Sequence, residues 1–114
     1  MAQTGAFTLP ANTNFGATVF SNAAYTQVVT ILVDGVQRAA FSGSGTNDKV
    51  LGSKVINSGS GKVQITVTAN GKPSAILTAN VSLADKCNFA VLGSEDGADA
   101  DYNDAIVVMN WPLG

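Results

Sequence analysis

The chain has 114 residues, of which 46% are hydrophobic and 12% are charged, so we expect one domain spanning residues 1–114 with its own hydrophobic core. Six Lys and Arg residues against eight Asp and Glu residues give a net charge of -2, and a mild acidic excess without a basic run argues against nucleic acid and anionic membrane surfaces as partners. There is no His and only one Cys, which excludes His-dependent catalytic triads, His-ligated zinc and a disulfide within the chain.

Short runs rich in Val, Thr and Ile, separated by turn residues, predict an all-β fold. In chain order these runs are Phe7-Thr8-Leu9, Ala17–Phe20, Thr26–Val33, Val36–Phe41, Lys62–Ala69, Ile76–Leu83, Asn88–Leu92 and Ala105–Trp111. The dipeptides at residues 34–35 (Asp-Gly) and 70–71 (Asn-Gly) favour tight hairpin turns, and the Gly/Ser clusters at residues 42–45 and 58–61 are expected between strands. No segment places apolar residues at helical spacing over a useful length. We therefore expect a single antiparallel β-sandwich of about nine short strands.

The last predicted strand is continuously apolar from Ala105 to Met109. Only one face of a strand meets the core of a sandwich, so the second apolar face indicates either a subunit interface or a central strand covered on both sides. The chain then ends in Trp111-Pro112-Leu113-Gly114 without a polar tail, and we expect such a terminus to dock rather than fray. Both features favour a homo-oligomer.

Five of the eight acidic residues lie in one short segment, at Glu95, Asp96, Asp99, Asp101 and Asp104, and no Lys or Arg follows residue 86. Carboxylates this close raise each other's pKa unless a cation lies among them. Carboxylate and amide oxygens are hard ligands that select calcium or magnesium over zinc or copper, and calcium accepts the less regular shell. The spacing is not that of an EF-hand, but it predicts a calcium site with enough carboxylates for more than one ion.

Three other interpretations of this acidic segment stay open on the residues alone. It could be a solvated loop without a ligand, a calcium site that only stabilises an adhesion or assembly module, or the carboxylate pair of a glycosidase. A glycosidase must keep one carboxyl group protonated, whereas crowded acids shared among cations stay ionised. We therefore expect a binding protein and not an enzyme.

Several further segments, taken together with the acidic loop, resemble the small calcium-dependent bacterial lectins that bind fucose and mannose, typified by the fucose-binding lectin of Pseudomonas. The segments that carry the resemblance are Phe7–Thr13, Phe15-Gly16, Asn57–Gly61, Asn70–Ser74, Gly93–Gly97, Asp101–Asp104 and Asn110–Gly114. They are spread over the whole chain, and the acidic loop combined with the Trp-Pro-Leu-Gly terminus is the most specific part.

The resemblance implies a nine-stranded β-sandwich lectin, usually a homotetramer, that binds mannose or fucose through two calcium ions. One ion would be held by Glu95, Asp99, Asp101 and Asp104, and the other by Asn22, Asp101, Asn103 and Asp104 with the terminal carboxylate of Gly114 from a neighbouring subunit. The sugar would lie against Ala23, Ala24, Tyr25, Asp96, Ala98, Asp99, Asp101, Asp104 and Gly114. In the family, Ala at the first position after Asn22 favours mannose and Ser favours fucose, so Ala23 predicts a preference for mannose.

The first residues show neither the basic segment nor the apolar segment of a signal peptide. We therefore expect synthesis in the cytoplasm, and any export or display at the cell surface would follow a route that needs no signal peptide.

Overall fold

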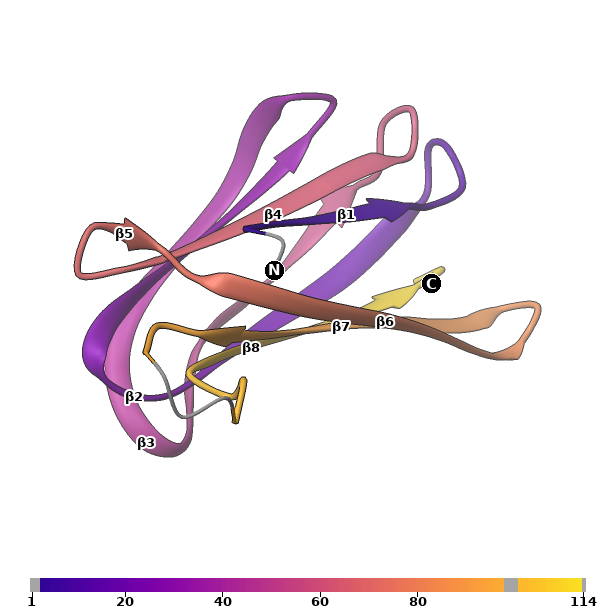
Figure 1. Ribbon diagram of the computed structural model, residues 1–114. Helices are drawn as coiled ribbons and strands as arrows, with labels where there is room; N and C mark the ends of the chain where they lie inside the picture. The colour runs from indigo at the N-terminus through magenta and orange to yellow at the C-terminus, as the bar shows by residue number, and fades with distance from the viewer. Residues whose placement is uncertain (1–2, 98–100, 114) are drawn as a thin grey trace.

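The computed structural model describes residues 3–97 and 101–113, which form eight strands joined in antiparallel pairs (Figure 1). The strands are β1 (Thr4–Thr8), β2 (Asn14–Val33), β3 (Val36–Asn57), β4 (Lys62–Ala69), β5 (Lys72–Pro73), β6 (Ala75–Ala84), β7 (Cys87–Glu95) and β8 (Ala105–Trp111). The predicted all-β fold is confirmed, and no helix occurs in the described part of the chain. In these residues there is accordingly no helix long and apolar enough to cross a bilayer.

The two predicted hairpin turns are confirmed. Asp34 and Gly35 join the paired residues Val33 and Val36, with φ angles of 53° and 78°. The Asn-Gly dipeptide at residues 70–71 joins β4 to β5 with the same pair of angles. Positive φ at both central residues is the geometry that matches the twist of a two-residue hairpin, and Asn-Gly and Asp-Gly adopt it at the lowest cost.

Strands β2 and β3 are longer than the sequence predicts. The two runs predicted at residues 17–20 and 26–33 belong to one strand, β2, whose pairing with β3 is irregular between Ser21 and Gln27. The Gly/Ser cluster at residues 42–45, expected between strands, lies inside β3. A Cβ atom on Gly43 would come within 2.7 Å of Leu51 Cδ2, so this glycine permits a close approach between the two halves of β3 instead of making a turn.

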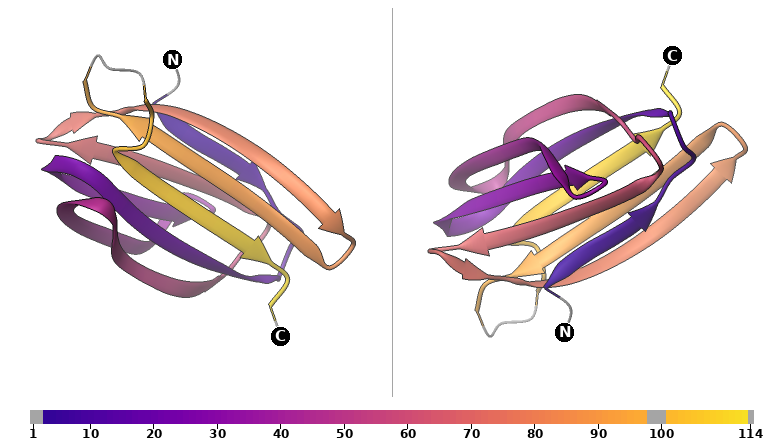
Figure 2. Two further views of the ribbon diagram at one scale, coloured as in Figure 1. Left: turned by 90° about the horizontal axis from the view of Figure 1, so that it is seen from below. Right: turned by 90° about the horizontal axis from the view of Figure 1, so that it is seen from above.

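The strand order is β1-β4-β2-β8-β7-β6, with β3 along β2 and β5 along β4. The first part of β2, residues 16–21, pairs with β8, and its last part, residues 27–33, pairs with β4. The bent β2–β3 ribbon therefore joins two layers, and the sheet closes over itself until β1 packs near β6 (Figure 2). Alternate residues point into the space between the layers, and the largest of those that are fully buried are Phe15, Ile31, Ile65, Leu92 and Met109.

Strand β8 is a central strand between β2 and β7. Its inward residues, among them Val107 and Met109, are buried, whereas Ile106 and Val108 on the outward face are half-buried. The predicted docking of the terminus is confirmed for the residues described: Trp111 is buried, and the Leu113 N–H donates to the Asn14 carbonyl at 3.2 Å. Cys87, the single cysteine, is the first residue of β7 and is half-buried.

Candidate functional site

The loop between β7 and β8 lies against the bend of β2, at the lower left of Figure 1. The Asn22 N–H of β2 donates to the Asp104 carbonyl at 2.9 Å, and the Asp104 N–H donates to the Ser94 carbonyl at 3.0 Å. The Ser94 hydroxyl accepts the Ala105 N–H at 3.0 Å. These bonds fix both ends of the acidic loop on strands whose inner faces are packed in the core.

Gly93 allows the returning loop to approach β7 closely. A Cβ atom at this position would lie 2.3 Å from the Tyr102 carbonyl oxygen, a contact that real side chains essentially never make. Tyr102 itself has a φ of 51°, in the left-handed region that non-glycine residues seldom adopt. The loop is therefore held in an uncommon backbone conformation, and such strain is typical of binding sites.

The loop brings three of the predicted ligands together. Glu95, Asp101 and Asp104 each offer one carboxylate oxygen, and these oxygens all lie within 4.8 Å of one another. Glu95 and Asp104 are 6% and 7% exposed, so two of the three carboxylates are largely removed from water. Asp101 is exposed, and the cluster therefore keeps one open side.

Backbone N–H groups of the same loop hold these carboxylates in place. Glu95 accepts from the Gly97 N–H at 3.0 Å and from the Tyr102 N–H at 3.2 Å through its two different oxygens. Asp104 Oδ2 accepts from the Asp96 N–H at 2.8 Å. The orientations of the Glu95 and Asp104 carboxylates are thus set by the backbone of the loop.

Burial raises the pKa of the Asp104 carboxyl group above its usual value, and the nearby Asp96 carboxylate also raises it. The hydrogen bond from the Asp96 N–H lowers this pKa, but it does not cancel the effect of burial. A raised pKa means that the local environment disfavours the negative charge. None of the six Lys and Arg residues lies in or after the loop. A bound divalent cation would remove this penalty, and the all-oxygen donor set fits calcium.

The side chain of Asn103 is oriented in a way that also fits a cation. One terminal atom of its amide lies 3.0 and 3.1 Å from the two carboxylate oxygens of Asp101. If this terminal atom is the amide nitrogen, Asn103 donates a hydrogen bond to each carboxylate oxygen of Asp101. If it is the amide oxygen, it converges with the two Asp101 oxygens as the ligands of a shared cation do. Both arrangements keep Asn103 and Asp101 together.

The other predicted residues fall into three groups. Ala98, Asp99 and Gly114 lie outside the described residues. Ala23 is buried, whereas Ala24 and Tyr25 are exposed at the bend of β2. Tyr25 and Asp96 border a hollow of about 240 Å³ whose other walls are Ala69, Asn70, Lys72 and Pro73.

Asn22 lies beside the loop, but its side chain is turned toward β3. The Asn22 amide donates to Asp48 Oδ1 at 2.7 Å, and its oxygen accepts the Asp48 N–H at 2.7 Å. Both polar atoms of the Asn22 side chain are therefore bonded to Asp48. Asp48 was not among the predicted residues, because nothing in the sequence links it to a position 26 residues away.

Sequence reasoning also missed Gln27, which is fully buried beneath the loop. Its side-chain nitrogen donates to the Tyr25 carbonyl at 3.1 Å and to Asp96 Oδ2 at 3.2 Å. One feature of the sequence could have revealed Gln27. It continues the inward-facing series of Val29, Ile31 and Val33, so it is a polar residue at a position that the alternation assigns to the core.

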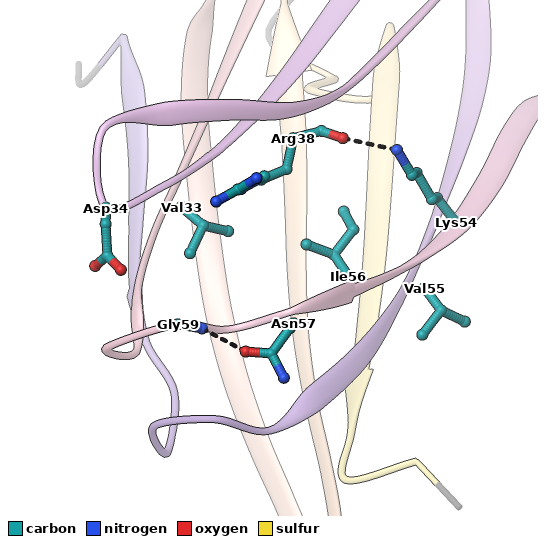
Figure 3. Close-up of a pocket in the computed structure, with 8 residues that line it drawn as sticks. All are labelled: Val33, Asp34, Arg38, Lys54, Val55, Ile56, Asn57 and Gly59. Atoms are coloured by element: carbon teal, nitrogen blue, oxygen red, sulfur yellow. Dashed lines mark hydrogen bonds between the residues drawn. The ribbon is translucent and has the colours of Figure 1, made fainter.

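A second hollow, of about 370 Å³, lies near the Asp34-Gly35 turn, at the far end of the β2–β3 ribbon from the acidic loop (Figure 3). Its polar groups are largely used within the protein: Ser60 donates both its N–H and its hydroxyl to Asp34, and Lys54 donates to the Arg38 carbonyl at 2.8 Å. The Ser60 hydroxyl bond is the main reason that the pKa of Asp34 is lowered. No predicted site residue lies in this hollow.

A rigid antiparallel β-domain with a preformed carboxylate cluster beside an open hollow has the features of a cation-dependent binding protein. The family model described as "Fucose-binding lectin II (PA-IIL)" matches residues 7–113, so the chain belongs to this lectin family. Lectins bind carbohydrates without converting them, and the expectation of a non-enzymatic protein is thereby confirmed.

Three solved structures resemble the chain over nearly its whole length. A high-affinity mannose-binding lectin of Ralstonia solanacearum is 62% identical, with a TM-score of 0.94 over 96% of this chain and 97% of that one. The Chromobacterium violaceum lectin CV2L, in complex with alpha-methyl-fucoside, is 61% identical, with a TM-score of 0.95 over 99% and 100%. The C-terminal domain of the Burkholderia cenocepacia lectin BC2L-C is 46% identical, with a TM-score of 0.90 over the whole of both chains. A search of curated proteins finds no match.

Proposed function

We propose that the chain binds mannose- and fucose-type monosaccharides through calcium ions held in the acidic loop. The observation that carries this proposal is the convergence of three carboxylates within 4.8 Å, two of them buried, in a part of the chain without a Lys or Arg. The proposed ligands of two ions are Asn22, Glu95, Asp99, Asp101, Asn103 and Asp104, with the Gly114 carboxylate of a second copy.

Calcium suits a sugar site because it takes about 6 to 8 oxygen ligands in a flexible shell. Seven proposed ligand residues shared between two ions leave coordination places open, and neighbouring sugar hydroxyls supply oxygens of the same hard type. The exposed carboxylate of Asp96 accepts a further hydrogen bond from a sugar hydroxyl. The residues Ala23, Ala24 and Tyr25 form the neighbouring wall of the site.

The proposed preference is for mannose over fucose. It rests on the resemblance to the family, in which Ala at the position of Ala23, the first after Asn22, favours mannose and Ser favours fucose. The relatives include both kinds of lectin: the Ralstonia protein is described as mannose-binding, and the Chromobacterium protein is in complex with a fucoside.

The proposal also requires a homo-oligomer, because a chain cannot bring its own terminus to its own loop. Strand β8 starts at Ala105 beside the acidic loop and ends at Trp111, so the six steps between these residues, at a rise of about 3.3 Å each, separate the two ends by about 20 Å. Figure 2 shows the chain leaving β8 at the opposite end of the sheet from the β7–β8 loop. This separation supports the proposal that the Gly114 carboxylate comes from another copy.

The outward face of β6, β7 and β8 offers a surface on which a second copy can pack. Cross-strand pairing places Leu77, Val81, Phe89, Val91, Ile106 and Val108 on this one face. Leu77, Val81 and Val91 are 45%, 49% and 38% exposed. A contiguous apolar face of this kind is typical of a protein–protein interface.

Retention on mannose-agarose and fucose-agarose, with calcium and then with EDTA, tests the proposed function. We expect retention in calcium on both, stronger on mannose, and elution by EDTA. The variant Asp104→Asn should lose retention, whereas Asp85→Asn, which changes an exposed acid outside the loop, should keep it. Retention that survives EDTA, or no retention on either sugar, would contradict the proposal.

A further inference from the structure

We infer that Gln27 is a positioning residue of the sugar site, which joins the bend of β2 to the Asp96 carboxylate; this assignment rests on the proposed function. Gln27 is 0% exposed. Its side-chain nitrogen donates to the Tyr25 carbonyl at 3.1 Å and to Asp96 Oδ2 at 3.2 Å. Both partners are acceptors, so the orientation of the amide is settled: its oxygen cannot face either of them.

The two hydrogen bonds connect parts of the site that are distant in sequence. Tyr25 belongs to the wall formed by the β2 bend, and Asp96 lies 69 residues beyond Gln27, at the start of the acidic loop. The Asp96 backbone is already held by its N–H bond to Asp104, so Gln27 removes the remaining freedom of the Asp96 side chain. A carboxylate fixed in this way loses less conformational entropy when a sugar hydroxyl binds to it.

Gln27 is poorly suited to a purely structural role. Its Oε1 atom is buried and accepts no hydrogen bond from the described residues, and a buried acceptor without a partner destabilises the folded state. The other inward residues of this part of β2, Val29, Ile31 and Val33, are apolar and fully packed. An apolar side chain of similar length would fit the position better if stability alone mattered, so the polar group is best explained by its two contacts at the site.

The variant Gln27→Met tests this assignment, because Met keeps the length of the side chain and removes both donated bonds. We expect the affinity for methyl mannoside, measured by calorimetry in calcium, to fall about threefold to tenfold, because the Asp96 side chain must then be ordered when the sugar binds. The calcium affinity should stay within about twofold, because no proposed calcium ligand bonds to Gln27. The melting temperature should stay the same or rise, and a structural residue would instead lower it.

Ser74→Ala is the matched control. Ser74 is also buried, and its hydroxyl also lacks a partner among the described residues, but it bonds neither Tyr25 nor Asp96. We expect Ser74→Ala to leave sugar affinity unchanged and to stabilise the fold slightly. If Gln27→Met fails to fold, Gln27→Glu replaces it: a carboxylate facing Asp96 should weaken sugar binding at neutral pH.

The outcomes separate this assignment from the proposed function. If the unaltered chain binds methyl mannoside and Gln27→Met binds it within twofold, the positioning role is wrong while the lectin function stands. A melting temperature that falls along with the sugar affinity would also overturn it, because Gln27 would then act through the fold. If the unaltered chain binds no sugar in calcium, the proposed function fails, and the role of Gln27 fails with it.

Discussion

Gly93→Ala provides the most direct test of how the loop geometry supports the proposed calcium site. The added Cβ atom would lie 2.3 Å from the Tyr102 carbonyl oxygen, whereas real Cβ atoms keep at least 3.0 Å from their neighbours. The backbone at Tyr102 must therefore move away by about 0.7 Å. Asp101 and Asn103 flank this residue, and calcium–oxygen distances are about 2.3–2.6 Å. A shift of that size exceeds the tolerance of the shell and removes at least one ligand.

A hydrogen bond or ligand contact to a charged group contributes about 1.5–3 kcal/mol, so we expect Gly93→Ala to weaken calcium binding about tenfold to a hundredfold. Calorimetric titration of calcium into EDTA-stripped protein measures this directly. Gly97→Ala is the control in the same loop, because its Cβ would meet Glu95 Oε2 at an ordinary 3.5 Å. Calcium affinity within twofold of the unaltered chain for Gly93→Ala would refute the reasoning.

Three further predictions concern the sugar, the terminus and pH. Ala23→Ser should shift the preference from mannose toward fucose, measured as the ratio of the two affinities; an unchanged ratio would show that this residue does not set the preference. One residue added after Gly114 should weaken sugar binding by displacing the terminal carboxylate, with the melting temperature in EDTA unchanged; unaltered affinity would remove the terminus from the site. In EDTA, the melting temperature should rise as the pH falls through the raised pKa of Asp104 in the folded chain toward the lower pKa of this group in the unfolded chain. In that range the folded state binds a proton that the unfolded state does not, and this stabilises the folded state. The variant Asp104→Asn should abolish this rise.

The parts of the fold that the sequence predicts well are those fixed by neighbouring residues. The two hairpins follow from Asp-Gly and Asn-Gly dipeptides, and the boundaries of β4 follow from the alternation of Val63, Ile65 and Val67. The continuous β2 and β3 strands could not be predicted in this way. The bend of β2 depends on its pairing with β4 on one side and with β8 on the other, and both partners are far from β2 in the chain.

The same distinction holds for the site. The acidic loop is recognisable because its carboxylates are close together in the sequence, and the structure brings Glu95, Asp101 and Asp104 within 4.8 Å of one another, while their role as ligands stays a prediction. Gln27 and Asp48 act on residues 69 and 26 positions away, so only the fold reveals their partners. The positions of Asp99 and Gly114 lie outside the described residues, and their roles as ligands stay predictions.

The length of β8 has a consequence for how the protein would behave when it becomes dilute. If one end of this strand carries the loop and the other end carries the carboxylate that another copy needs, each complete site requires an encounter between two chains. The fraction of complete sites then depends on total protein, as in any reversible association. Sugar binding would therefore weaken on dilution while every chain is still folded, and glycan-coated surfaces that bring the chains together would restore it.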